Sequence, residues 1–427
     1  MLNDQPINIL VFPCGSEIGL EVHRSLQFSR FFHLVGASSV SDHGSFVFED
    51  YVNGIPFVND DACVPALSQI IQDRKIQILI PATDTALMVL KEAEHILGCK
   101  VLASCVETTA LCYNKAKTYR SLNSTIAVPK LWNNPPENET DYPVFLKPEI
   151  GHSSIGTRKC YNAEECFAHM KMVPNCLILE YLPGEEYTID CFSDRHGHLR
   201  FAQARTRSRI QNGISVHTRV LEEQDEFQYM AIAINQLWSL RGAWFFQLRR
   251  RTSGELVLLE VASRLAGSSG ICRVQGINFA ILSVIDALDL DVTMPKPIGT
   301  PILDRALSNR FHLGLNFNTV YCDFDDCLII RNQVNIQLVS FLYHCHNTGK
   351  NVVLISRHKG NLDEELSKWR LQHLFHQIFH IDYDSPKADH IVSKSAIFID
   401  DSFAERQAVY KAKGIPVFGP DAVEALF

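Results

Sequence analysis

The sequence predicts a multidomain protein of the α/β and α+β classes, and three observations lead to this fold class. Apolar runs at 7–12 and 76–80 are typical of buried strands in a parallel sheet, and helix-like segments alternate with them. The chain has 427 residues, which is enough for two to four domains. The stretch 293–301 is interrupted by prolines and a glycine and predicts a linker.

These patterns divide the chain into four parts. Residues 1–110 are expected to form an α/β domain, 111–292 a second domain of mixed strands and helices, 293–314 a linker, and 315–427 a further α/β domain. Gly15 and Gly19 follow the first strand, but their spacing does not fit a dinucleotide-binding loop, which favours a packing turn over a phosphate-binding one.

Composition narrows the range of functions. Hydrophobic residues make up 46% and charged residues 21%, as in ordinary soluble proteins, and the net charge of -8 argues against nucleic-acid binding. The sequence has no bilayer-spanning apolar stretch, and its start does not resemble a signal peptide. The 13 cysteines include no C-x-x-C pair, which argues against structural zinc and redox motifs. We therefore predict a cytoplasmic protein without nucleic-acid or membrane partners, and leave a homodimer open.

Two apolar runs near the C-terminus end in acidic residues. The first leads into Asp323 and Asp325, and the second into Asp400 and Asp401. Carboxylates that gather at the carboxyl ends of parallel strands repel one another unless a cation holds them. Mg²⁺ accepts one or two carboxylates together with water and phosphate oxygens. The pattern predicts a phosphoryl-handling site, although one acidic pair alone would also fit a solvated turn.

Two further residues complete an ordered set. Ser356 follows the strand-like run 351–355, and Lys387 comes before the second acidic pair. In this order, the last quarter of the chain resembles the haloacid dehalogenase-like (HAD) phosphohydrolases. The spacing of about 30 residues between Asp325 and Ser356 leaves no room for a large cap domain.

The resemblance implies a role for each of these residues. Asp323 would be the nucleophile, and Asp325 the general acid and base. The phosphoryl oxygens would be held by Ser356 and Lys387, and Mg²⁺ by Asp323, Asp325, Asp400 and Asp401. Cys327 departs from the family, which usually has Thr or Val there. Because that residue packs behind the loop, we expect little effect.

The middle of the chain carries a second constellation. A strand-like run delivers Lys147, and the sequence Gly-His-Ser-Ser-Ile-Gly over 151–156 then supplies a mobile turn with accessible N–H groups. Together with the segments around 176–190, 245–247 and 258–264, these features make residues 1–290 resemble the ATP-grasp ligases, of the carbamoyl-phosphate-synthase-like kind. That resemblance implies ATP and Mg²⁺ as cofactors.

The ATP-grasp resemblance also implies site residues. Lys115 and Lys147 would contact the α- and β-phosphates, and the loop with Ser153 and Ser154 would close over them. The adenine edge would meet Glu180 and the backbone near Leu182, and the ribose hydroxyls would meet Glu186. Mg²⁺ would be held by Gln247 and Glu260, and Arg264 would neutralise charge on the transferring phosphoryl group.

One departure weakens the metal site. The family usually has a metal-ligating asparagine two residues after the glutamate, and here that position is Ala262. Gln247 is neutral where an acid is often found. We therefore expect looser binding of one Mg²⁺, or a water in place of the missing oxygen.

Two arginines are candidates for substrate binding. Arg205 and Arg207 alternate in a strand-like run and so lie on one face. A guanidinium suits an anionic group on the substrate, although a solvated basic strand face fits the pattern equally well.

Taken together, these features predict a bifunctional enzyme. Its first part would couple a small carboxylate to an amine or similar nucleophile through an acyl phosphate, and its tail would dephosphorylate a small phosphorylated metabolite. Two alternatives remain open: a kinase-like ATP-grasp enzyme with a regulatory phosphatase, and a nucleotide-binding sensor whose ATP-grasp site is degenerate while its phosphatase is active.

Overall fold

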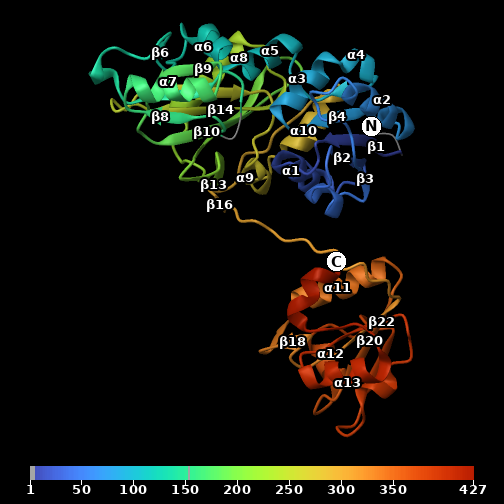
Figure 1. Cartoon of the computed structure of the whole chain (residues 1–427). Helices are drawn as coiled ribbons and strands as arrows, with labels where there is room; N and C mark the ends of the chain where they lie inside the picture. The colour runs from blue at the N-terminus through green and yellow to red at the C-terminus, as the bar shows by residue number, and fades with distance from the viewer. Residues whose placement is uncertain (1–4, 152–153) are drawn as a thin grey trace. The chain divides into compact units, whose positions relative to one another are not determined.

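The chain divides into two units, Met1–Leu307 and Ser308–Phe427 (Figure 1). The computed structural model describes residues 5–151 and 154–427. No helix within these ranges is both long and apolar enough to cross a bilayer. Each unit contains a five-stranded parallel sheet, as the strand patterns at both ends of the sequence predict.

The N-terminal sheet has the strand order β3-β2-β1-β4-β5. Both of its faces are buried, because successive residues of β1 point into two different apolar clusters. Ile9 and Val11 enter one cluster with helices α1 and α10, and Leu10 and Phe12 enter the other with α2 and α3. The bounds are β1 Ile7–Phe12, α1 Glu17–Leu26, β2 Phe32–Ala37, β3 Asp50–Val52, α2 Cys63–Asp73, β4 Ile78–Pro81, α3 Asp84–Glu92, α4 Glu94–Leu97, β5 Lys100–Val101 and α10 Phe279–Ala287.

Two four-stranded antiparallel sheets form the middle of the first unit, β6-β9-β7-β8 and β11-β10-β14-β15. The second packs one face against helix α8 through Ile189, Trp244 and Phe246. Because side chains alternate along a strand, their neighbours Thr188 and Gln247 point to the opposite face. The bounds are α5 Val106–Tyr113, α6 Lys115–Leu122, β6 Leu131–Trp132, β7 Val144–Pro148, β8 Arg158–Cys160, α7 Ala163–Met172, β9 Cys176–Glu180, β10 Glu186–Ser193, β11 Leu199–Thr206, α8 Asp225–Leu237, β14 Gly242–Arg250, β15 Leu256–Ala262 and α9 Gly270–Val274.

Part of the segment predicted as a linker contributes a strand to the first unit. β16 (Ile302–Asp304) pairs antiparallel with β13 (Ile214–Arg219), and β13 in turn pairs with β12 (Arg209–Gln211). Arg305, directly after β16, forms an ion pair with Glu17 of α1. The chain is therefore anchored to the first unit up to residue 305.

The second unit is built around a parallel sheet in the order β21-β20-β17-β22-β23. Apolar residues again fill both faces: Val320 and Leu354 belong to one cluster, and Tyr321 and Ile355 to the other. Between β17, the first strand of this sheet in the chain, and β20, the elements are the hairpin β18–β19 and helix α11. The bounds are β17 Thr319–Cys322, β18 Ile329–Ile330, β19 Gln333–Val334, α11 Ile336–Asn347, β20 Asn351–Ser356, α12 Leu362–Lys368, β21 Gln377–His380, β22 Ala396–Ile399, α13 Phe403–Lys413 and β23 Val417–Phe418.

The second core predicts a mutational effect. Leu354 is fully buried on β20, so Leu354→Ala should lower the free energy of unfolding of this unit by about 2–5 kcal/mol. Hydrogen exchange of peptides from β17 and β20 measures the loss. Ile336→Ala removes a similar side chain that is 73% exposed and should change stability by less than about 0.5 kcal/mol. Equal effects of the two substitutions would contradict the placement of this core.

Candidate functional site

A cavity of about 260 Å³ opens between the two antiparallel sheets of the first unit. It collects residues that lie far apart in the sequence, and these include most of the predicted nucleotide contacts. Its wall contains Lys115, Lys147, Ser154, Glu180, Leu182, Glu186, Gln247 and Glu260. Ser153 lies outside the described residues. The described residues of the predicted nucleotide site therefore lie around one cavity.

Two lysines enter this cavity from different elements. Lys147 lies near the end of β7 and donates from Nζ to the carbonyl oxygen of Leu259 at 2.9 Å. Lys115 begins α6 and donates from Nζ to the carbonyl oxygen of Gly151 at 2.6 Å. Burial, reinforced by the nearby Lys115, lowers the pKa of Lys147 to about 7. Bound phosphate groups would favour the charged form of Lys147.

Two of the three glutamates in the wall of this cavity, Glu180 and Glu186, already have cationic partners. Glu180 accepts from Nε of Arg251 at 2.6 Å. Glu186 forms an ion pair with Nε of Arg207 at 2.9 Å and a longer one with Arg249 at 3.6 Å. A nucleotide that reached these carboxylates would share them with guanidinium groups. Arg251 was not predicted as a site residue, because the 71 residues between it and Glu180 leave no local pattern in the sequence.

Gln247 and Glu260 face each other across β14 and β15. Directly opposed residues of antiparallel strands point to the same side of the sheet, so both oxygen-bearing side chains lie together. Ala262 lies two residues after Glu260 and on the same face, where its methyl group supplies no ligand. These two side chains offer few oxygens, yet Mg²⁺ commonly completes its shell with phosphate oxygens and water, so the pair is compatible with a loosely held ion.

A second cavity of about 360 Å³ adjoins the first. The two share Gln247 and Glu260 in their walls, together with Lys115 and Arg207. Arg205, Arg207 and Arg264 all line the second cavity. Arg205 is only 1% exposed, which rules out a solvated strand face for that residue.

Acidic partners hold all three of these arginines, and that of Arg207 is Glu186. Arg205 donates from Nε to Asp190 at 2.6 Å in a fully buried pair. Arg264 forms two hydrogen bonds with Asp84, of 2.7 Å and 2.6 Å, and stacks on the ring of Phe245 at 5.2 Å. The predicted cationic residues thus lie at the cavity, but each reaches it as part of an ion pair.

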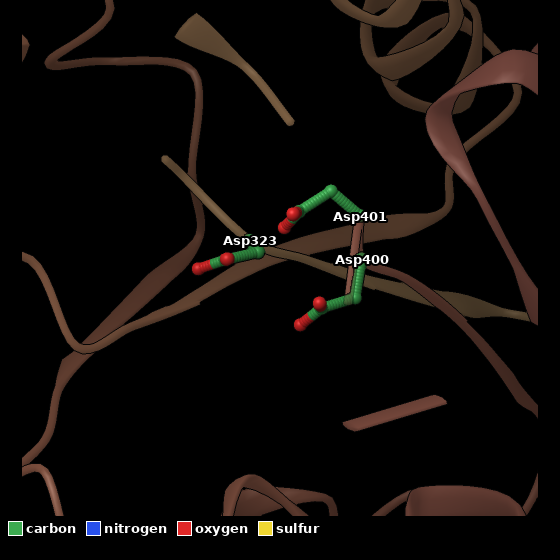
Figure 2. Close-up of side chains that lie close together, drawn as sticks. All are labelled: Asp323, Asp400 and Asp401. Atoms are coloured by element: carbon green, nitrogen blue, oxygen red, sulfur yellow. The ribbon is translucent and has the colours of Figure 1, made fainter. Parts of the chain in front are cut away.

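In the second unit, three residues of the predicted phosphoryl site follow or end neighbouring parallel strands. Asp323 follows β17, Ser356 ends β20, and Asp400 follows β22, so neighbouring strands bring them to one edge of the sheet. Figure 2 shows the side chains of Asp323, Asp400 and Asp401 close together. Their carboxylate oxygens include a set that lies within 4.8 Å of one another, which suits a single metal ion.

A lysine lies among these carboxylates. Nζ of Lys387 is 3.0 Å from Oδ2 of Asp323 and 2.6 Å from Oδ2 of Asp400. Burial raises the pKa of Asp323 to about 6, Lys387 opposes that change, and Asp400 adds to it. The cation therefore offsets only part of the electrostatic cost, and a metal ion would favour the charged carboxylates further.

Other residues surround this edge of the sheet. Asp325 is half-exposed, and its Oδ1 lies 3.0 Å from Nδ1 of His358. His358 was not predicted as a site residue. Cys327 is buried, with Sγ 3.8 Å from the carbonyl oxygen of Ile399. It lies behind the loop, where the sequence analysis placed it.

Solved structures identify the fold of the first unit. The biotin carboxylase domain of Hydrogenobacter thermophilus 2-oxoglutarate carboxylase, solved with MgADP, is 14% identical and matches 70% of this chain and 74% of its own, with a TM-score of 0.58. N5-carboxyaminoimidazole synthetase from Staphylococcus aureus, complexed with ADP, is 15% identical over 72% of this chain and 84% of its own, with a TM-score of 0.58. The first unit has the ATP-grasp fold.

Sequence matches agree with the ATP-grasp fold. Residues 172–306 match a family described as ATP-grasp in the biosynthetic pathway with Ter operon. The D-alanine–D-alanine ligase of Thermotoga maritima is 26% identical over 133 residues, which cover 29% of this chain and 44% of that ligase. The chain thus matches less than half the length of this curated relative. An L-amino acid ligase from Bacillus licheniformis is 20% identical over 67% of this chain and 75% of its own, with a TM-score of 0.52. ATP and Mg²⁺ are the cofactors of ATP-grasp enzymes, as the sequence analysis predicts.

The depressed pKa of Lys147 predicts proton uptake on nucleotide binding. At pH 8, above its pKa of about 7, Lys147 is mostly neutral in the free protein, and bound phosphates should raise that pKa and charge it. Calorimetric titration with ATP in buffers of different ionisation enthalpy should show an uptake approaching one proton. Lys147→Met should abolish the uptake, whereas Lys117→Met, on the exposed face of α6, should preserve it. Unchanged uptake in Lys147→Met would rule out this assignment.

Proposed function

We propose that the first unit is an ATP-dependent ligase that joins a small carboxylic acid to an amine or similar nucleophile. One observation carries this proposal: Gln247 and Glu260 belong to the walls of both cavities. Gln247 and Glu260 would hold Mg²⁺ where the two cavities meet, and the ion would neutralise charge on the phosphate oxygens of ATP. ATP would occupy the cavity with the lysines, and the acid would occupy the cavity with the arginines.

The proposed reaction has two steps, which form and then consume an acyl phosphate. A carboxylate oxygen of the acid attacks the γ-phosphorus, the bond to the β-phosphate oxygen breaks, and ADP leaves. The nucleophile then attacks the acyl carbon, phosphate departs with the bonding electrons, and the amine loses a proton. Lys115 and Lys147 bind the phosphates, and Arg264 lies at the acid cavity, where transferred charge develops. Mg²⁺ would neutralise charge on the phosphate oxygens.

A nucleotide sensor is the second candidate for this unit. Ala262 supplies no ligand beside Glu260, and this observation favours weak metal binding and slow catalysis. A kinase-like enzyme would release ADP with the acid alone. A ligase differs from both because its turnover of ATP depends on acid and nucleophile together.

The metal pair tests the ligase proposal. Glu260→Gln should reduce ADP formation by at least roughly 10²-fold, because a neutral side chain binds Mg²⁺ and balances phosphate charge poorly. Ala262→Asn should lower the Mg²⁺ concentration that gives half-maximal rate. Coupled detection of ADP during Mg²⁺ titrations measures both. If Ala262→Asn leaves the metal dependence unchanged, the missing ligand comes from elsewhere and the alignment of β15 with the family is incorrect.

We propose further that the second unit is a HAD-type phosphatase acting on a small phosphorylated metabolite. This half of the proposal rests on the geometry of its own site, where Asp323, Lys387 and Asp400 lie together at one sheet edge. Asp323 attacks phosphorus, and Asp325 donates a proton to the leaving oxygen. Water, deprotonated by Asp325, then hydrolyses the aspartyl-phosphate. Mg²⁺, held by Asp323, Asp400 and Asp401, would neutralise the phosphoryl oxygens.

The nucleophile can be tested with a generic ester. Asp323→Asn should abolish Mg²⁺-dependent hydrolysis of p-nitrophenyl phosphate, because an amide does not attack phosphorus, and should leave ATP binding by the first unit intact. Asp326→Asn is a matched control, since it alters an exposed neighbour whose φ of 52° suits asparagine. Release of p-nitrophenol at wild-type rates from Asp323→Asn would refute the nucleophile assignment.

A further inference from the structure

Four polar residues form a row across the second antiparallel sheet. Thr188 of β10 lies opposite Arg205 of β11 on one side and opposite Gln247 of β14 on the other. Gln247 in turn lies opposite Glu260 of β15. Opposed residues of antiparallel strands share a face, and all four line the second cavity. The row therefore forms one wall of the cavity that the proposed function gives to the acid.

Two hydroxyl groups in this cavity are unsatisfied. Thr188 is 1% exposed and Ser215 of β13 is 5% exposed, and both line the cavity. Oγ1 of Thr188 and Oγ of Ser215 have no hydrogen-bond partner in the described part of the chain. Nε of Arg207 also lacks a hydrogen bond, although it lies at ion-pair distance from Glu186. Buried hydroxyls almost always find a partner, because leaving one unpaired is costly. A polar group of a bound molecule would supply what the protein does not.

The charges around the cavity also favour a ligand with polar, uncharged or cationic groups beside its carboxylate. Each of the three arginines in its described wall is held in an ion pair: Arg205 with Asp190, Arg207 with Glu186 at 2.9 Å, and Arg264 with Asp84. The remaining cation of that wall is Lys115, which donates to the carbonyl oxygen of Gly151 and also lines the nucleotide cavity. The wall is therefore rich in polar groups, but its arginine charge is already balanced.

We propose that the acid bound in this cavity is a polar monocarboxylic acid, whose hydroxyl or ammonium group bonds to Thr188 and Ser215. This inference rests on the proposed ligase function and narrows its substrate class. An aliphatic acid would leave both hydroxyls unpaired and would forfeit those bonds. A dicarboxylic or phosphorylated acid would bring a second negative charge to a wall whose arginines already have acidic partners.

The full chain can be tested without knowing the natural nucleophile. Hydroxylamine captures an acyl phosphate by attacking its acyl carbon, releases phosphate and yields a hydroxamate, which is measured by its iron complex. The acids are lactate, alanine and serine as polar monocarboxylates, propionate as the aliphatic match, and malate and aspartate as dicarboxylates. At least one polar monocarboxylate should give a kcat/KM roughly tenfold or more above that of propionate and of the dicarboxylates.

Substitutions of the two hydroxyl residues add a direct test. Thr188→Val and Ser215→Ala should each raise the KM for the best polar acid by roughly tenfold, with little change in the KM for ATP. Thr188→Ser keeps the hydroxyl and should retain the wild-type preference. Asp84→Asn removes the charge that balances Arg264 and should raise the rate with malate or aspartate relative to the monocarboxylates.

Each outcome separates the inference from the function on which it rests. Failure of every acid to give a hydroxamate would overturn the ligase proposal and this inference together. Hydroxamate formation that is equal or faster with propionate, malate or aspartate would overturn the substrate class alone. If the KM for the polar acid is unchanged in both Thr188→Val and Ser215→Ala, the two hydroxyls do not contact the acid and this assignment is wrong.

Discussion

The functional architecture of the first unit depends on the register of β10 with β11 and β14. β10 is the strand that pairs with both, so a shift of one residue would turn its whole polar face toward helix α8. The apolar residues Ile189 and Phe246 prevent this shift, because exposing them would cost the burial that holds the sheet to α8. The same hydrophobic pattern therefore places Thr188 and Gln247 at the cavities.

In the second unit, a buried lysine allows two acidic residues to lie next to each other at the sheet edge. Parallel strands β17 and β22 bring Asp323 and Asp400 to one edge, where the two charges repel each other. Lys387 lies between them and is buried with them. Removing one member of such a buried group leaves an uncompensated charge, so loss of Lys387 would destabilise this edge of the sheet. Position and stability are thus linked in this site.

Much of this arrangement could be predicted from the sequence, since it follows from local patterns. The parallel sheets follow from apolar runs, and the convergence of Asp323, Ser356 and Asp400 follows from strand ends that share one edge. The ion pairs could not be predicted. Asp84 begins α3 and Arg264 lies in the loop after β15, 180 residues away, so their contact depends on how the N-terminal domain packs on the antiparallel sheet. β16 could not be predicted either, because it has only three residues and forms by pairing with β13, which lies far away in the sequence.

The ion pairs change how the candidate site is understood. From the sequence, we predicted that these arginines bind an anionic substrate or phosphoryl group. In the structure, Arg205, Arg207 and Arg264 each form an ion pair with an acidic residue of the protein. A guanidinium in a fixed pair still offers donors, but its charge is largely balanced and its position is held. Recognition of a second anionic group then depends on rearranging a pair, whereas recognition of a hydroxyl or ammonium group depends on the polar groups that have no hydrogen-bond partner. The unsatisfied hydroxyls of Thr188 and Ser215 are therefore better indicators of what the cavity accepts than the number of arginines around it.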